Sequence, residues 1–522
     1  MLRSIFSNWL AFLLIGIISF LITPFMIHRL GDFQFGIYTL AFSVAGYSDL
    51  LEQGIRSTLQ RFVARLSGTH DREGTNVVFS TALALTCVVA VAVILICAGL
   101  SRSLPLFFKL AVSQRELFAW LLILLGLNVG VGFPAALLGS YLTGLQRFDL
   151  YNIVAIVRQV IRAGLIVLVL LRGHGVLAVA VCVLVSTIIT LPLNWWLIRV
   201  VDTEVRFAFR LVRLGMAREL LSFSMWMLLS NAGQFLREST DSIVIGRVLG
   251  AALITPFTVA ARFVNYFRPI IGGIVSPLLP RIAELDGQNR QADMQELFLR
   301  VTRISALVSL AVGALILLDG RSLLLHWVGR QYLSSYPVLV LLTIGTVVSL
   351  AQLGAAGALA AVGRHRAYGV WTLAEGVANL ILSVYWARKY GIVGVALGTA
   401  VPLLAVKLVL QPWYVARVLK FTLWQYVREA LARPVAVCIL LLALCTPWGG
   451  FQAVDSIWRF LWIIAGQGVI ACGLVFVIGL DRSDRRLAQR ILSRVGERLQ
   501  IVQPGSAIAA LRESLGFEDR WP

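Results

Sequence analysis

Two arginines lie near the middle of an apolar run that is long enough to cross a membrane. Arg158 and Arg162 are four residues apart, so a helix over 150–171 would carry both guanidiniums on one face. A charge that faces lipid at a helix centre costs about 2.5–3.5 kcal/mol on insertion scales. The same run contains no acid that could pair with either arginine. We therefore expect this face to line a watery, basic cavity, or else to pair with acids on neighbouring helices.

Further charged and aromatic residues fall within other apolar runs. The basic ones, with two tyrosines that could stack on sugar rings, are candidate substrate-binding residues: Arg237, Arg262, Arg268, Lys407, Tyr38 and Tyr266. The acidic ones are candidates for coupling transport to an ion: Asp49, Glu52, Asp241 and Glu375. Arginine forks suit phosphate oxygens, so a cavity lined by them would attract an anionic cargo.

A structural role is the alternative for these residues. Glu52 precedes Arg56 by four positions, and Arg237 precedes Asp241 by four, which are spacings that allow ion pairs along one helix. Such pairs would fix the register of helices rather than bind cargo. The alternative for the tyrosines is packing in the core or at the membrane interface.

The elements that position these residues are predicted to be membrane-spanning helices. The chain has 522 residues, of which 59% are hydrophobic and 14% charged, and its mean hydropathy is +0.85. Apolar blocks of twenty or more residues indicate helices that cross a bilayer. We predict an all-α polytopic membrane protein with about 14 transmembrane helices. They lie at 5–27, 34–55, 76–100, 117–142, 150–171, 175–198, 217–248, 252–279, 298–318, 336–362, 366–387, 391–415, 431–448 and 458–480.

The distribution of positive charge predicts the orientation in the membrane. The formal net charge is +20 at pH 7. Lysines and arginines concentrate in the N-terminus, in alternate loops and in the tail, a positive-inside pattern that places both termini in the cytoplasm and argues against nucleic-acid binding. Residues 199–216 are predicted to be a basic cytoplasmic linker. The tail, 481–522, carries apolar residues at helical spacing, which predicts an amphipathic helix on the membrane surface: Leu487, Ile491, Val495 and Leu499.

The sequence contains an internal repeat with an offset of 219 residues. The matches include Leu30-Gly31 with Leu249-Gly250, Gly54 with Gly273, Gly144 with Gly363, and Arg147 with Arg366. They predict two six-helix repeats, 1–198 and 217–416, followed by two C-terminal helices within 417–480. Because six is an even number, both repeats have the same orientation, and their relating axis runs along the membrane normal. Two such bundles around a central cavity are typical of transporters that work by alternating access.

Motifs for catalysis are absent from the sequence. It has no Walker A loop, no HExxH and no G-x-S-x-G, so we predict neither a built-in ATPase nor another enzyme. The six cysteines all fall inside predicted spans and form no CxxC pair, which favours packing roles over disulfides or metal ligands. We expect no cofactor and no metal.

The stretch 30–66 resembles the opening of polysaccharide-export flippases. These belong to the multidrug/oligosaccharidyl-lipid/polysaccharide exporter superfamily. The family features are a Leu-Gly pair, a Gly-x-Tyr, and a glycine followed by basic residues, which here are Leu30-Gly31, Gly36-Ile37-Tyr38, Gly54, Arg56, Arg61 and Arg65. Residues 241–263 resemble the start of the family's second half, with Asp241, Gly246 and Leu249-Gly250, although Phe257 replaces the usual tyrosine.

The resemblance implies a flippase that translocates undecaprenyl-pyrophosphate-linked oligosaccharide across the bacterial inner membrane for surface polysaccharide biosynthesis. The implied partners are this lipid-linked oligosaccharide and membrane lipids, with a polysaccharide polymerase and glycosyltransferases as candidate protein partners. Three alternatives stay open: a cation-coupled multidrug exporter, a flippase for the peptidoglycan lipid precursor, and a scaffold without transport. A drug exporter would favour acids in the cavity, whereas a scaffold would need no charged cavity.

Overall fold

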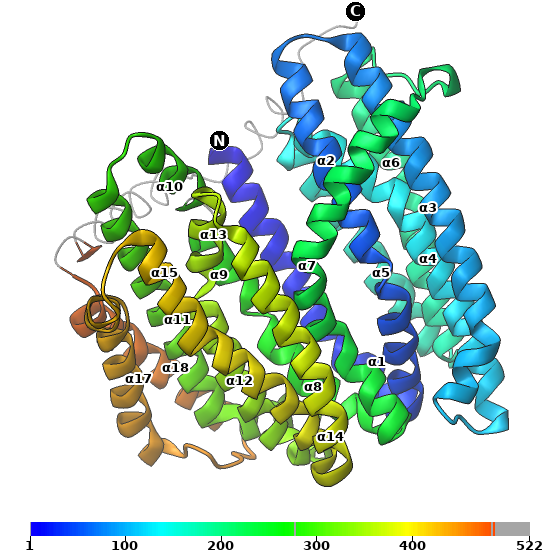
Figure 1. Cartoon of the computed structure of the whole chain (residues 1–522). Coiled ribbons are helices and arrows are strands. Elements are labelled where there is room, and N and C mark those ends of the chain that lie inside the picture. The colour runs from blue at the N-terminus through cyan, green and yellow to red at the C-terminus, as the bar shows by residue number, and fades with distance from the viewer. Residues whose placement is uncertain (1, 276–277, 482–483, 486–522) are drawn as a thin grey trace, which may run out of the picture.

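The chain folds into a bundle of helices. The computed structural model describes residues 2–275, 278–481 and 484–485, and no strand occurs in these ranges. Figure 1 labels most of the α-helices, which are α1 (Leu2–Gly46), α2 (Asp49–Gly68), α3 (Arg72–Phe107), α4 (Val112–Gly144), α5 (Phe148–Leu171), α6 (Val176–Val201), α7 (Leu214–Val248), α8 (Ile254–Asn265), α9 (Arg268–Val275), α10 (Leu278–Gly287), α11 (Gln291–Trp327), α12 (Tyr336–Ala351), α13 (Leu353–Ala361), α14 (His365–Ala405), α15 (Gln411–Leu419), α16 (Leu423–Tyr426), α17 (Ala432–Cys445) and α18 (Ile457–Leu474). The predicted tail helix, with Leu487, Ile491, Val495 and Leu499, lies outside the described residues.

Ten helices of the described part are long and apolar enough to cross a membrane. Two of them far exceed the roughly 20 residues that one crossing needs, since Ser7–Gly46 has 40 residues and Ala367–Leu419 has 53. Each contains a glycine with positive φ, at 74° for Gly31 and 60° for Gly391. Residues with a Cβ adopt positive φ poorly, so glycine is what lets the chain turn between two crossings there. Both glycines fall at the boundary between two spans that the hydropathy pattern separates.

Three of the predicted spans are interrupted. The second predicted span stops before Tyr47 and resumes as α2 at Asp49. The eighth stops before Tyr266 and resumes as α9 at Arg268. The tenth breaks at Gln352, between α12 and α13, so the expectation of continuous helices is wrong at all three places.

Pro269 explains the restart of the eighth span, because proline lacks an N–H and suits the first turn of a new helix. No proline accompanies the break in the second span, where Gly46 ends one helix and Ser48 precedes the next. The breaks in the second and eighth spans lie 219 residues apart.

The helices form two groups, which meet along α1, α2, α7 and α8 (Figure 1). We call α1–α6 the N-terminal group and α7–α16 the C-terminal group. Within them, α3 packs on α4, α4 on α6 and α1 on α5, while α7 packs on α14 and α11 on α12. Helices α17 and α18 pack against α11, on the side away from the N-terminal group.

The hydrophobic core is shared at one end of the molecule and divided at the other. One core crosses between the groups and includes Phe35 of α1 and Phe257 of α8, both almost fully buried. Toward the other end each group has a core of its own, around Phe79 in the N-terminal group and Phe298 in the C-terminal group. We call the first the closed end and the second the open end. The open end carries the start of α1, the tip of α2 and α10 (Figure 1).

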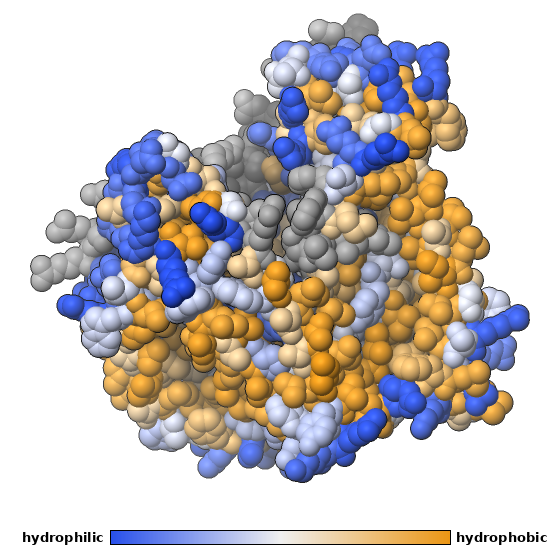
Figure 2. All heavy atoms as spheres, viewed as in Figure 1, coloured by the Kyte–Doolittle hydropathy of each residue, from blue (hydrophilic) through white to orange (hydrophobic). Residues whose placement is uncertain are grey.

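The surface has the polarity of a membrane protein. Figure 2 shows an apolar band across the visible face of the body, polar residues along its lower edge, and two polar lobes that stand apart at the open end. Large apolar side chains are exposed in this band, among them Val88 at 67% and Trp462 at 78% of their full area. Exposed apolar surface on this scale would be unstable in water, which supports the prediction of a multi-pass membrane protein.

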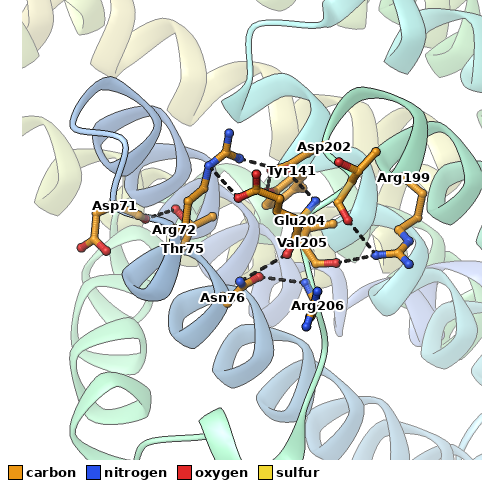
Figure 3. A network of polar contacts seen from close by, with 11 residues as sticks. Asp71, Arg72, Thr75, Asn76, Tyr141, Arg199, Asp202, Glu204, Val205 and Arg206 are labelled. Atoms are coloured by element: carbon orange, nitrogen blue, oxygen red, sulfur yellow. Dashed lines mark hydrogen bonds and ion pairs between the residues drawn. The ribbon is translucent and has the colours of Figure 1, made fainter.

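The predicted linker is docked on the N-terminal group (Figure 3). Arg72 of α3 forms an ion pair with Asp202 at 3.0 Å, and the hydroxyl of Tyr141 donates to the same carboxylate at 2.7 Å. The amide of Asn76 bonds the backbone on both sides, donating to the carbonyl of Glu204 at 3.4 Å and accepting from the N–H of Arg206 at 2.8 Å. The linker backbone is therefore held to α3 by side chains along its length.

Candidate functional site

A cavity with five charged residues in its lining lies between the two helix groups. Its volume is about 430 Å³, within the roughly 300–1,000 Å³ range of small-molecule sites. The N-terminal group contributes α1 and α2, and the C-terminal group contributes α7, α8, α9, α12 and α14. Its charged lining residues are Asp49, Arg237, Asp241, Arg262 and Arg268. Five of the twelve candidate site residues chosen from the sequence therefore meet around one cavity.

Two broken spans form facing walls of this cavity. The wall from the second predicted span contains Thr39, Phe42, Ser43, Gly46 and Asp49. The wall from the eighth contains Thr258, Ala261, Arg262, Asn265 and Arg268. Each residue of the second set lies 219 positions after its counterpart in the first. The helix breaks expose the last member of each set, because Asp49 and Arg268 both begin a new helix beside the cavity.

Arg262 reaches from the C-terminal group to α1. Its guanidinium donates to the hydroxyl of Thr23 at 3.1 Å and lies over the ring of Phe35, 5.3 Å from the ring centre. Both contacts lie on the N-terminal group, so Arg262 bridges the groups while also lining the cavity. A hydrogen bond to a neutral hydroxyl leaves most of its five donors available for an anion.

Arg237 and Asp241 belong to a buried polar cluster in the C-terminal group. Arg237 forms an ion pair with Glu375 of α14, and both side chains are at least nine-tenths buried. The Thr399 hydroxyl lies 3.1 Å from both oxygens of the Asp241 carboxylate, and the Asn379 amide donates to that hydroxyl at 2.8 Å. The sequence suggests Asp241, four positions away on the same helix, as a partner of Arg237, whereas the ion pair with Glu375 joins α7 to α14.

The remaining acids differ in how they are paired. The Glu52 carboxylate accepts from Arg56 at 3.5 Å, as their spacing predicted. Asp49 makes no hydrogen bond or ion pair within the part of the chain that the structure describes, and its side chain is exposed to the cavity. Asp49 is thus an accessible carboxylate in the N-terminal wall.

Arg158 and Arg162 do not line this cavity. They lie on α5, which packs against α1. Arg162 donates to Gln159, whose amide in turn donates to the Ser19 hydroxyl of α1 at 2.9 Å. Arg158 is exposed and interacts electrostatically with Glu52, and Arg162 does so with Arg262. The pair therefore stands beside the cavity, within electrostatic reach of its walls.

Three further candidates lie apart from the cavity lining. Lys407 is buried in a π-helical turn, where its ammonium is 4.8 Å from the centre of the Tyr368 ring. Tyr38 is buried in the shared core, with its ring 6.2 Å from that of Phe42. Tyr266 packs edge-on against Phe20 at the closed end, with ring centres 5.9 Å apart.

The closed end is sealed by contacts that the sequence did not reveal. Trp327 of α11 stacks on Phe20 of α1 at 4.9 Å, and its indole N–H donates to the Phe20 carbonyl at 2.9 Å. Thr255 of α8 donates to the carbonyl of Asp32 at 2.6 Å, and Tyr332 donates to the Asp32 carboxylate. The repeat is the one sequence signal that points to Asp32. Asp32 directly follows Gly31, and Gly31 matches Gly250 at the offset of 219 residues.

Metal ligands do not gather in the described residues. No group of three or more His, Cys, Asp or Glu side chains is placed to hold a metal ion within those ranges. The six cysteines are free thiols.

The fold is that of transporters of the MOP superfamily. The lipid II flippase MurJ, in an inward closed conformation, superposes with a TM-score of 0.71 over 91% of this chain and 98% of that one, at 12% identity. An inward-facing MATE multidrug resistance transporter superposes with a TM-score of 0.67 over 78% and 95%, at 17% identity. These likenesses establish the fold.

The family follows from the sequence comparison. The profile of the polysaccharide biosynthesis protein family matches residues 30–337, and the chain belongs to that family. Membrane protein EpsK of Bacillus subtilis, itself uncharacterized, is 21% identical over 492 residues, which cover 92% of this chain and 96% of EpsK. A candidate O-antigen transporter of Shigella flexneri is 21% identical over 398 residues, or 75% and 92%. The resemblance to polysaccharide-export flippases is thereby confirmed.

Proposed function

We propose that this protein flips undecaprenyl-pyrophosphate-linked oligosaccharide across the bacterial inner membrane for surface polysaccharide biosynthesis. The observation that carries the proposal is the pair of arginines, Arg262 and Arg268, on one wall of a cavity between two helix groups. Guanidinium forks match the oxygens of a pyrophosphate. Membership of a polysaccharide biosynthesis family and the likeness to flippase folds support this cargo over other anions.

The proposed topology has fourteen crossings, arranged as two repeats of six and two further helices, with both termini in the cytoplasm. The broken spans at matching positions support the repeats. In this orientation the open end faces the cytoplasm, where the cargo is made, and the closed end faces outward. Rocking of 1–198 against 217–416, around the docked linker 199–216, would open the closed end in turn. The residues 417–480 and the tail 481–522 take no part in this proposed rocking motion.

Coupling to an ion is proposed for Asp241 before the other three acids. It is buried, lines the cavity, and is backed by Thr399 and Asn379 instead of by a single dominant ion pair. A site of this kind can change its proton or cation occupancy as the groups move. A polymerase and glycosyltransferases are the proposed protein partners, since they use or make such a cargo.

A cation-coupled drug exporter is the second candidate. The observation in its favour is that Asp49 and Asp241 line the same cavity as the arginines. A flippase for the peptidoglycan lipid precursor is a narrower variant of the first proposal, and differs from it only in the headgroup.

A proteoliposome assay tests the proposal. A lipid-linked oligosaccharide is placed in vesicles with wild type, and an enzyme that cleaves only outward-facing headgroups is added. We expect headgroups that are protected in protein-free vesicles to become accessible. The Arg262→Gln variant should lower the rate about 30-fold or more, the equivalent of about 2 kcal/mol. The matched control is Arg102→Gln, which removes an exposed arginine remote from the cavity. Export of a drug cation without headgroup movement would replace the proposal with the second candidate.

A further inference from the structure

The two facing walls of the cavity carry opposite charge. The wall from α1 and α2 ends in the Asp49 carboxylate and has the Ser43 hydroxyl before it, on the other side of the helix break. At the matching positions, the wall from α8 and α9 has Arg262 and Arg268. Two copies of one repeat would be expected to line the two walls with similar residues. The opposite charges at equivalent positions therefore come from side chains in which the two copies differ.

Unpartnered hydroxyls on both walls point to a polar ligand. The Oγ1 atoms of Thr39 and Thr258 are buried and have no hydrogen-bond partner in the described residues. Both side chains line the cavity, and both residues are more than nine-tenths buried. A buried hydroxyl without a partner costs about 1–3 kcal/mol, which a ligand or a bound water can recover once a small shift of the wall exposes the oxygen. Threonine hydroxyls on both sides suit a ligand that is itself rich in hydroxyls.

The cavity volume limits what enters it. About 430 Å³ lies near the lower part of the range for small-molecule sites, so it suits a phosphate-linked sugar better than a whole oligosaccharide. The rest of the oligosaccharide would extend toward the open end. The unit that meets both walls is then the sugar nearest the lipid, together with the pyrophosphate that joins them.

We propose that the two walls orient this headgroup and that Asp49 contacts its first sugar and selects which sugars bind. The inference rests on the proposed flippase function. The pyrophosphate lies against Arg262 and Arg268, and the first sugar faces Asp49, whose carboxylate accepts hydrogen bonds from two sugar hydroxyls or from an amino group. A sugar that carries its own carboxylate is rejected there, because like charges in a partly desolvated site repel. The site thus selects a neutral or amino first sugar against a hexuronic acid.

Binding of two matched probes tests the inference. The probes are farnesyl-pyrophosphate-linked glucose and farnesyl-pyrophosphate-linked glucuronic acid, titrated calorimetrically into the purified full-length protein. We expect wild type to bind the glucose probe at least about tenfold more tightly. Asp49→Asn should reduce this preference to about threefold or less by strengthening binding of the glucuronate probe. The control Glu116→Gln, an exposed acid outside the cavity lining, should keep the wild-type ratio.

A second variant keeps the test independent of how well Asp49→Asn folds. Ser43→Asp adds a carboxylate to the same wall and should raise the preference for glucose further. Arg262→Gln should weaken both probes alike, because each carries the same pyrophosphate.

The outcomes separate the inference from the proposed function. Equal binding of both probes to wild type, or an unchanged ratio in Asp49→Asn, would overturn the inference and leave the flippase standing. A uniform loss of both probes in Asp49→Asn would also overturn it, and would assign Asp49 to ion coupling. Failure of wild type to bind either probe would overturn the proposed function and the inference together.

Discussion

The two helix groups differ at five positions that are buried in the C-terminal group. In the C-terminal group these hold the polar cluster of Arg237, Asp241, Glu375, Asn379 and Thr399. The residues 219 positions earlier are Ile18, Ile22, Ile156, Val160 and Ala180, all apolar, and only Ala180 among them is buried. The corresponding helices still pack, α1 against α5 as α7 does against α14. A six-helix group can therefore be built without the cluster, which favours a role in transport over a role in folding.

The largest expected effect comes from breaking the cluster's ion pair. Glu375→Gln leaves the guanidinium of Arg237 in a buried site without its carboxylate partner on α14. Removing one partner of a buried pair typically costs about 3–5 kcal/mol. We expect a large drop in the midpoint of thermal unfolding in detergent, followed by tryptophan fluorescence.

The double variant Arg237→Ile/Glu375→Ile is the matched comparison, because it copies the N-terminal group. Replacing both partners with apolar residues is often neutral or stabilising. We expect its unfolding midpoint to return to that of wild type while flipping is lost. A double variant that unfolds as early as the single one would mean that the cluster is required for folding after all.

The second effect concerns the contact between the groups at the closed end. A Cβ on Gly36 would lie 2.2 Å from the carbonyl oxygen of Ala251, so Gly36→Ala forces α1 away from the C-terminal group. Overpacking of this kind costs about 1–3 kcal/mol. We expect greater accessibility of a cysteine placed at Thr255 to a membrane-impermeant maleimide. Gly16→Ala, where nothing lies within 4 Å, should change nothing.

The counterpart of this contact shows the same difference between the groups. Thr255 lies 219 positions after Gly36, and its hydroxyl donates to the carbonyl of Asp32, the counterpart of Ala251. The contact of Thr255 with Asp32 is a hydrogen bond, whereas the contact of Gly36 with Ala251 is a close approach of two backbones without a side chain between them. If maleimide labelling did not change in Gly36→Ala, the added methyl group would be accommodated without separating the two groups at the closed end.

The third effect is expected on coupling. Asp241→Asn keeps the shape of the side chain but removes the negative charge that could hold a proton or cation. We expect the flipping rate under an imposed proton or sodium gradient to fall about tenfold, which corresponds to about 1.4 kcal/mol. Thr399→Ser, which keeps the hydroxyl beside Asp241, should retain the response. A variant that flips as fast as wild type under both gradients would exclude Asp241 from coupling.

The smallest effect concerns the segment that ends each group. In the N-terminal group Arg72 holds Asp202 with a charge, whereas in the C-terminal group Gln291, 219 positions later, donates to the Leu419 carbonyl at 2.7 Å. Arg72→Gln copies the neutral version. Because Arg72 is half exposed, we expect a loss of about 1 kcal/mol or less at low salt and none in 1 M salt. Urea unfolding at both salt concentrations measures it, and an equal loss at both would point to packing.

The sequence predicts those features of the fold that depend on neighbouring residues alone. Apolar run length predicted the helical bundle, and the matched Leu-Gly pairs marked positions where Gly31 and Gly250 both have positive φ. The break at Tyr47 is not predicted, because no proline marks it and the hydropathy pattern continues across it. The sequence also could not show which neighbour an intramembrane charge faces.

The arginines illustrate this limit. Arg262 and Arg158 look alike in the sequence, as charges within apolar runs. In the structure, Arg262 lines the cavity, and Arg158 lies on α5 beside it. Arg237 had an acid four residues away, yet its ion pair with Glu375 spans 138 positions. Such long-range partners depend on tertiary packing, which hydropathy and spacing do not encode.

The docked linker makes the peptide bond between the two helix groups dispensable for holding them together. Its backbone is held by Asn76 and Ser80 of α3, and Val205 is buried against the N-terminal group. A single protease cut between Phe207 and Ala208 would therefore leave both new ends anchored where they were. The chain could accordingly be produced as two separate polypeptides, 1–207 and 208–522, which we expect to reassemble in the membrane without the peptide bond that normally joins them.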